Sequence, residues 1–332
     1  MFSVRAGKFR RYSGEGFKQL LDIRTIYKNL RDIGRVLRGY SESYRLLRKI
    51  NPDIVFIKGG FVGVPVGLAA ASLRIPYVTH DSDSAPGLAN RIISRWAKVH
   101  AVALAKENYP YPSEKTFSVG VPINHNFVPV TPQLRIKYRE ELGLSKFQHI
   151  IFVTGGGNGA ATLNTIVAKC SRLILDNNST VGILHMAGRA LTEATETLYK
   201  QVLTDEQMKR VIIKGFDDKL YLYSGAADIV IGRGSATNLA EFAMQGKACV
   251  IVPARQLPWT VHNTRVLAED NAVISLDEDE LTQNPAGLAA TCNDLLSSPE
   301  KQLELGDKLS KALVHQNSAR ELATLIIENV NQ

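Results

Sequence analysis

The stretch IIFVTGGGNGAATLN (residues 150–164) decides the predicted fold of this chain of 332 residues. Residues 151–154 are apolar or β-branched and are typical of a buried strand; a glycine triplet, Gly155, Gly156 and Gly157, follows, and then a helix-forming segment. Glycines at a strand-to-helix turn let the backbone approach a ligand closely, and the start of the helix offers N–H groups and the positive end of a dipole. The stretch therefore predicts a place to hold phosphate.

A second stretch of the same build, IVIGRGSATNLAE (229–241), ends in the carboxylate of Glu241. A carboxylate in this position is able to bind the two hydroxyls of a ribose while the turn holds the phosphates. Arg233 lies in the turn, where its charge could offset that of a diphosphate. A single glycine turn is also compatible with a simple tight connection, but the two turns together favour a nucleotide pocket.

The composition, with 45% hydrophobic and 22% charged residues, is typical of a globular protein. The chain is long enough for two domains. The three cysteines, Cys170, Cys249 and Cys292, are far apart and lie in apolar surroundings. They are predicted to be buried thiols in a reducing cytoplasm rather than a disulfide framework. The sequence predicts neither a membrane span nor a signal peptide.

The net charge of +8 is concentrated in residues 1–50, which hold 13 Lys/Arg and 4 Asp/Glu. A basic amphipathic segment of this kind suits an anionic membrane surface, at about 1 kcal/mol per Lys or Arg. A helix face packed on its own domain is the plainer alternative, and nucleic acid is disfavoured as a partner because its recognition motifs are absent. The apolar residues that recur at helical spacing are Leu20, Leu21, Ile26, Leu30, Ile33, Leu37, Tyr44 and Leu46.

Beyond the basic segment, strands alternate with helices, which predicts parallel sheets covered on both faces, with ligands beyond the carboxyl ends of the strands. We expect two domains, residues 1–130 and 131–332, joined by a proline-rich linker (119–133) and facing each other across a cleft. A final helical region, 298–330, could fold back across the boundary, and residues 2–4 form a possible short strand. The predicted strands cover residues 54–57, 77–79, 100–103, 116–119, 150–154, 181–186, 211–215, 229–231, 249–252 and 273–275.

A cluster of polar residues, His80, Asp81 and Asp83, follows a predicted strand, where catalytic groups often lie. His80 or Asp81 could act as a general base on an acceptor. The spacing of Asp81 and Asp83 also fits a divalent cation, although a short pattern of this kind is weak evidence. The plainer alternative is that Asp83 and Ser84 cap the following helix.

Other candidate site residues lie in the second half of the chain. Phe216 could cover a nucleobase or belong to the core, and Trp259 could stack on a sugar near His262 and Asn263. His185, inside a predicted strand, is expected to be a core histidine. Serine nucleophile chemistry at Ser235 is not expected, because no G-x-S-x-G context surrounds it.

The order of several segments resembles the MurG family of peptidoglycan glycosyltransferases (glycosyltransferase family 28) over nearly the whole chain. The segments are GKFRRY, KGGFVGVP, HDSDSAPGLANR, VGVPI, TGGGNGA, GFDD and RGSATNLAE. The resemblance implies a GT-B fold of two Rossmann-like domains around a cleft, with no metal and no cofactor. It implies inverting transfer of N-acetylglucosamine from UDP-N-acetylglucosamine to a lipid-linked muramyl peptide, by a peripheral protein at the cytoplasmic face of the membrane.

The resemblance also assigns the donor site to particular residues. Gly157 and Asn158 would lie at the phosphate, Phe216 at the uracil and Glu241 at the ribose. Asp83 and Asn124 would contact the donor from the N-terminal side. The residues expected to surround the diphosphate and sugar are Arg233, Ser235, Ala236, Thr237, Asn238, Leu239, Ala240 and Asn263.

The sequence departs from the family pattern in three places. The first glycine loop of the family, GGTGGH-like and carrying a histidine, has no counterpart, so we expect an N-terminal domain without its first strand–helix unit. Asp81 stands where a glutamate is usual, and of the sugar-recognition stretch only Asn263 is clearly retained. The alternatives are therefore an inactive protein that binds a UDP-sugar or lipid carrier, and a transferase with another sugar or acceptor.

Overall fold

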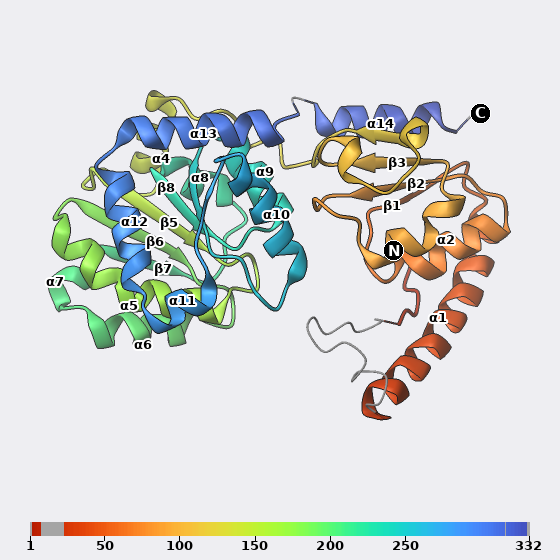
Figure 1. Ribbon diagram of the computed structural model, residues 1–332, viewed down its shortest axis with the longest axis horizontal. Coiled ribbons are helices and arrows are strands. Elements are labelled where there is room, and N and C mark those ends of the chain that lie inside the picture. Colours follow the sequence, from red (N-terminus) through yellow and green to blue (C-terminus); the bar gives the residue numbers. More distant parts are fainter. Residues whose placement is uncertain (1, 8–22, 316, 331–332) are drawn as a thin grey trace. The chain divides into compact units, whose positions relative to one another are not determined.

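The computed structural model describes residues 2–7, 23–315 and 317–330. The chain divides into two compact units, one formed by residues 1–122 with 315–332 and the other by residues 123–314. Each unit is built around a sheet of parallel strands, so the predicted α/β class is confirmed (Figure 1).

The first unit holds a four-stranded sheet in the order β1-β2-β3-β4. Tyr77 and Val78 are neighbours on β2 and point to opposite faces, as alternation along a strand requires. The face with Tyr77 packs against α1, α2 and α3, and the face with Val78 packs against α14. The strands are β1 (Val55–Ile57), β2 (Tyr77–Asp81), β3 (Val99–Val102) and β4 (Thr116–Ser118), and the helices are α1 (Ile23–Ile50), α2 (Gly63–Ser72), α3 (Leu88–Ile93) and α14 (Ser318–Glu328).

The second unit holds a six-stranded sheet in the order β10-β9-β8-β5-β6-β7. Its strands are β5 (His149–Thr154), β6 (Val181–Met186), β7 (Val211–Lys214), β8 (Ile229–Gly232), β9 (Ala248–Ile251) and β10 (Ile274–Ser275). Its helices are α4 (Pro132–Glu141), α5 (Ala161–Asn177), α6 (Thr192–Val202), α7 (Asp205–Met208), α8 (Leu220–Ala226), α9 (Ala236–Met244), α10 (Pro258–Glu269), α11 (Glu278–Gln283), α12 (Ala286–Leu296) and α13 (Pro299–Leu313).

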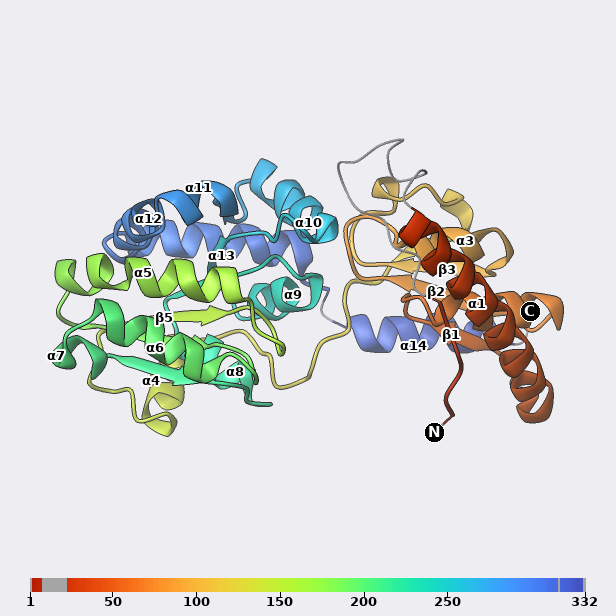
Figure 2. The ribbon, with the colours of Figure 1, turned by 90° about the horizontal axis from the view of Figure 1, so that it is seen from below.

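Helices cover both faces of this sheet (Figure 2), and an apolar cluster lies between the sheet and the helices on each face. On one face, Ile151 and Val153 pack against residues of α5, α6 and α12. On the other, Ile150 and Phe152 pack against residues of α4, α8 and α9. Strands that are buried on both faces have continuous apolar sequences, as these strands do. All ten predicted strands are confirmed, with ends that differ by at most a few residues.

The observed division differs from the expected boundary at residue 130 in two places. Phe127 lies in the second unit, where its ring contacts Tyr221 with 6.3 Å between centroids. The last helix, α14, belongs to the first unit because Leu322 and Leu325 pack against its sheet. The chain thus returns to its first unit after completing the second.

At the N-terminus, the possible strand at residues 2–4 is wrong, because those residues form neither a helix nor a strand. Phe2 is 69% exposed, and the Arg5 amide donates to the side chain of Glu42, at 2.8 Å from Oε2, rather than to a neighbouring strand. The amphipathic helix is confirmed in α1. The segment 8–12 of GKFRRY and the side chains of Leu20, Leu21, Ile26 and Leu30 lie outside the described part.

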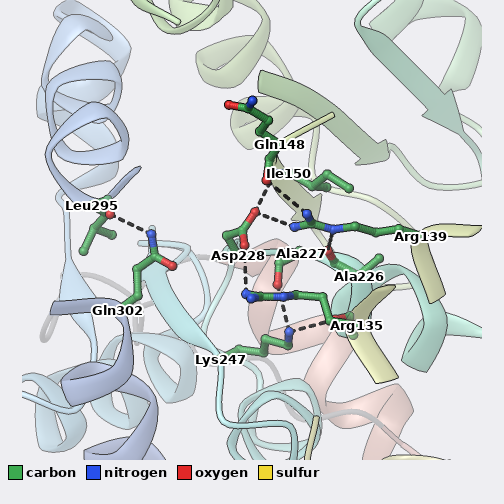
Figure 3. A network of polar contacts seen from close by, with 11 residues as sticks. Arg135, Arg139, Gln148, Ile150, Ala226, Ala227, Asp228, Lys247, Leu295 and Gln302 are labelled. Atoms are coloured by element: carbon green, nitrogen blue, oxygen red, sulfur yellow. Dashed lines mark hydrogen bonds and ion pairs between the residues drawn. The ribbon is translucent and has the colours of Figure 1, made fainter. Parts of the chain in front are cut away.

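A partly buried charge network holds the amino ends of β5 and β8 together (Figure 3). Asp228, just before β8, accepts from Arg139 at 2.7 Å, from Arg135 at 3.0 Å and from the Ile150 amide at 2.7 Å. Lys247 donates to two nearby carbonyl oxygens, and burial lowers its pKa to about 7. This network fixes the strand pair at the ends of the strands opposite to the glycine turns.

In the described part of the chain, no helix combines the length and the apolar character needed to cross a membrane.

Candidate functional site

The two glycine turns follow neighbouring strands. β5 pairs with β8 in parallel, with Ile151 opposite Ile229 and Val153 opposite Ile231. The strand order reverses at this pair, since β6 and β7 lie on one side of it and β9 and β10 on the other. Ligands of open parallel sheets bind beyond the carboxyl ends of the strands at such a reversal. The topology thus brings the two predicted phosphate turns to one place.

The first turn, residues 155–160, needs its glycines. Gly156 and Gly159 have φ of +84° and +76°, and a Cβ at Gly159 would overlap the carbonyl oxygen of Ala187. The turn is closed by the Gly159 amide, which donates to the Gly156 carbonyl at 2.9 Å. Gly157 and Asn158 are exposed, and within the described residues their amides make no hydrogen bond. These two amides are therefore available to an anion.

The second turn leads into α9 through a chain of side-chain hydrogen bonds. Ser235 caps the helix by accepting from the Asn238 amide, and its hydroxyl donates to Asn238 Oδ1 at 2.9 Å. Asn238 Nδ2 in turn donates to Glu241 Oε2 at 2.9 Å. The cap thus fixes the orientation of Asn238, and Asn238 fixes that of Glu241.

The two turns converge. A Cβ built on Gly156 would lie 4.0 Å from Asn238 Oδ1, and one built on Gly157 would lie 3.5 Å from Phe216 Cε2. The first turn therefore lies between α9 and the loop that carries Phe216, whose ring is 45% exposed. Glycine at 157 leaves an opening beside that ring.

Glu241 is a half-buried carboxyl with spare acceptor capacity. Burial raises its pKa to about 7, and the hydrogen bond from Asn238 offsets only part of this effect. The Asn238 bond is its one hydrogen bond among the described residues, whereas an ionised carboxylate is able to accept several. Hydroxyl donors of a bound ligand would stabilise the charged form.

Arg233 and Asn263, two of the residues predicted at the sugar and diphosphate, both have partners within the protein. Arg233 Nη1 lies 2.5 Å from Glu278 Oε1, so its charge is already balanced. Asn263, buried on α10, donates to the Gly234 carbonyl at 3.2 Å and so supports the second turn from behind. Trp259, on the first turn of α10, is 47% exposed.

The remaining residues of the second turn differ in exposure. Thr237 is exposed and Ala236 is half-buried, whereas Leu239 and Ala240 are buried with the core, so only their backbone groups could face a ligand.

His185 is a core histidine as predicted. Its ring nitrogens lie 2.8 Å from Tyr199 OH and 3.0 Å from Asn164 Oδ1, and burial lowers its pKa to about 3.

Sequence reasoning missed Arg189. Its guanidinium stacks on the Phe216 ring at 3.6 Å from the centroid, and its Nη1 would lie 3.9 Å from a Cβ on Gly157. The signal was present in the sequence, because Arg189 follows Gly188 directly after β6, the strand next to β5. Arg189 was not predicted as a site residue because the helix after it is not preceded by a run of glycines like Gly155–Gly157 or by another nucleotide-binding motif.

In the first unit, His80 and Asp81 are buried with partners. His80 Nε2 lies 3.0 Å from the Gly120 carbonyl, its Nδ1 lies 3.3 Å from Ser82 Oγ, and burial lowers its pKa. Asp81 accepts from Tyr111 OH at 2.7 Å and from the Gly87 amide, and burial raises its pKa. This geometry favours a structural role over the predicted acid–base role.

Asp83 and Asn124 lie on loops. The Asp83 carbonyl accepts from Tyr109 OH at 2.9 Å, which anchors the segment after β2. Asn124 is exposed in the linker, and its Oδ1 accepts from the Asn126 amide at 2.9 Å. Among the described residues, no group of three or more His, Cys, Asp or Glu side chains is placed to hold a metal ion.

Comparison with known proteins agrees with this geometry. The model of the glycosyltransferase family 28 C-terminal domain matches residues 150–325, and that of the N-terminal domain of the same family matches residues 13–102. A protein of Shouchella clausii named UDP-N-acetylglucosamine--N-acetylmuramyl-(pentapeptide) pyrophosphoryl-undecaprenol N-acetylglucosamine transferase is 31% identical over 85% of this chain and 73% of its own length. A Borreliella burgdorferi protein of the same name is 26% identical over 99% of this chain and 82% of its own.

A solved structure supports the fold. MurG of Acinetobacter baumannii superposes with a TM-score of 0.68 at 24% identity, covering 90% of this chain and 79% of that one. The GT-B architecture expected from the sequence is therefore confirmed at the level of the fold.

Proposed function

The chain belongs to glycosyltransferase family 28, and on that premise we propose that it transfers N-acetylglucosamine from UDP-N-acetylglucosamine to a lipid-linked muramyl peptide. The names of its curated relatives support this donor and acceptor. The observation that carries the proposal is the convergence of two glycine turns and Glu241 at the strand reversal.

In the proposed donor site, the amides of Gly157 and Asn158 bind phosphate oxygens at the first turn. Phe216 contacts the uracil, and Glu241 accepts hydrogen bonds from the ribose hydroxyls. Asn263 supports the second turn through the Gly234 carbonyl, and Arg233 lies in that turn, paired with Glu278. The other residues proposed for the donor site, all in the second unit, are Asn124, Gly155, Gly156, Ser235, Ala236, Thr237, Asn238, Leu239 and Ala240.

The proposed reaction is an inverting displacement. An acceptor hydroxyl forms a bond to C1 of the sugar and releases its proton to solvent, the bond between C1 and the β-phosphate oxygen breaks, and its electron pair leaves with UDP. Negative charge develops on the UDP, where the turn amides and the positive end of the α9 dipole stabilise it. These groups supply the stabilisation without a metal or cofactor. We assign no base, since His80 and Asp81 are buried and hydrogen-bonded within the first unit.

We propose attachment to an anionic membrane through α1, on the cytoplasmic face. From residue 23 to 50 the helix carries eight Lys/Arg and two Asp/Glu. Leu37 and Trp96 are 65% and 47% exposed, and they line a groove of about 440 Å³ together with Tyr40 and Leu68. Apolar side chains among cations are the combination that binds a lipid surface. Sedimentation with vesicles tests this: binding is expected to need anionic lipid and to weaken with salt, and indifference to both would contradict it.

A second candidate, a protein that binds a UDP-sugar without transferring it, is favoured by the burial of His80 and Asp81. A transfer assay separates the two. Radiolabelled UDP-N-acetylglucosamine and a lipid-linked muramyl peptide are incubated with the chain, and labelled lipid is measured. Product formation supports the transferase, whereas UDP binding without product supports the second candidate. A protein that neither binds UDP nor forms product would exclude both.

A further inference from the structure

Arg189 lies beside the first glycine turn, and we propose that it binds the diphosphate of the nucleotide. The inference rests on the proposed function, since it assumes that a nucleoside diphosphate occupies the two turns. Arg189 follows β6, and Gly188 before it has a φ of +97°.

The position of the guanidinium is set by the Phe216 ring. Arg189 Cζ lies 3.6 Å from the ring centroid, a close cation–π stack. The guanidinium carries five N–H donors, and a cation–π contact leaves them able to bind an anion at the side of the ring. Since Nη1 would lie 3.9 Å from a Cβ on Gly157, a phosphate bound at the Gly157 amide is within reach of these donors.

The charge of Arg189 is available to a ligand. Arg189 is exposed, and it has no acidic partner in the part of the chain that the structure describes. Arg233 pairs with Glu278 and Arg255 pairs with Asp279, so these two cations at the same end of the sheet are already balanced. A diphosphate would gain an ion pair from Arg189 without breaking another.

Binding measurements on a ligand series test the proposal. UDP, UMP and uridine are titrated into the full chain and into Arg189→Ala, Arg189→Lys and Lys200→Ala. Lys200 is a matched control, an exposed cation on α6 that pairs with Glu196. Loss of a charge-assisted hydrogen bond to phosphate is expected to weaken UDP binding by about 10- to 100-fold in Arg189→Ala. Uridine binding should change by less than about threefold, because uridine has no phosphate for Arg189 to contact.

The two other variants sharpen the result. Arg189→Lys keeps the charge but not the planar donors, so it should recover part of the UDP affinity, and Lys200→Ala should match the unaltered protein. Equal losses for UDP and uridine would overturn the proposal, because Arg189 would then act through Phe216 on the base. Unchanged UDP affinity in Arg189→Ala would also overturn it. If the unaltered protein fails to bind UDP, the proposed function itself fails, and the titration of that protein alone shows it.

Discussion

Asn238 donates to Glu241 across one turn of α9, with 2.9 Å between Nδ2 and Oε2. Residues three apart on a helix lie on the same face, and the partner of Asn238 on the other side is the capping residue Ser235. The cap of the helix and the acidic side chain in it are therefore coupled through one amide. This coupling directs the carboxyl of Glu241 while leaving it acceptor capacity for a ligand.

The first prediction concerns pH. Burial raises the pKa of Glu241 to about 7, so in the free protein this group contributes stability below pH 4.5 that is lost as pH rises through about 7. Ribose hydroxyls need the ionised form, so UDP affinity should instead rise, by about tenfold between pH 6 and pH 8. Calorimetric titration of UDP at both pH values measures it. Glu241→Gln removes the titration of the carboxyl but keeps any titration of the UDP phosphate. If UDP affinity depends on pH in the same way in this variant and in the unaltered protein, the assignment of Glu241 to the ribose is contradicted.

The second prediction concerns Gly159. Gly159→Ala places a methyl group against the Ala187 carbonyl in a backbone conformation with φ of +76°, so the turn has to move. We expect the free energy of unfolding to fall by about 2–4 kcal/mol and UDP binding to weaken. Gly143→Ala is the control, because φ is +68° there but no atom lies within 4 Å of the added Cβ. It should cost only about 1 kcal/mol and leave UDP binding unchanged; equal costs in denaturant unfolding would contradict the account.

The third prediction concerns Asp228 in the network of Figure 3. Asp228→Asn removes the negative charge that balances Arg135 and Arg139 near the buried Lys247. Breaking a buried ion pair in this way should destabilise the second unit by about 3–5 kcal/mol. Asp294→Asn, which removes an exposed pair with Lys301, should cost at most about 1 kcal/mol. Denaturant unfolding of the two variants compares them, and similar midpoints would show that the network stabilises little.

The fourth prediction concerns His80. Its two ring nitrogens are engaged in the interior, so His80→Ala should lower the free energy of unfolding by about 2–4 kcal/mol without weakening UDP binding. His80→Gln, whose amide is able to donate toward the Gly120 carbonyl, should recover part of that loss and most of the transfer activity. A Gln variant with an unchanged melting temperature but a strongly reduced kcat would instead assign His80 to catalysis.

Much of the fold could be predicted because its signals are local. The runs at 150–154 and 229–231 are apolar on both faces of the sheet, and a glycine turn follows each, so strand, turn and helix follow from neighbouring residues. The convergence of the two turns also follows, once the strands are parallel and adjacent.

The remainder depends on contacts between residues far apart in the sequence. The pairing of Arg233 with Glu278, 45 residues away, leaves no trace in the sequence near either residue. The burial of His80 depends on the Gly120 carbonyl, and the return of α14 to the first unit depends on apolar contacts of Leu322 and Leu325. The position of Arg189 after a predicted strand and a glycine is visible in the sequence, but its contact with Phe216 forms only in the folded chain.

The central claim is that the two turns and Glu241 bind a single UDP molecule, and a cycle of two ligands and two proteins tests it most directly. UDP and 2′,3′-dideoxy-UDP are titrated by calorimetry into the unaltered protein and into Glu241→Ala. Loss of charge-assisted hydrogen bonds to the ribose should weaken UDP binding by about 1.5–3 kcal/mol and leave the binding of the dideoxy analogue nearly unchanged. Equal effects of the substitution on both ligands, or no effect on UDP, would contradict the claim.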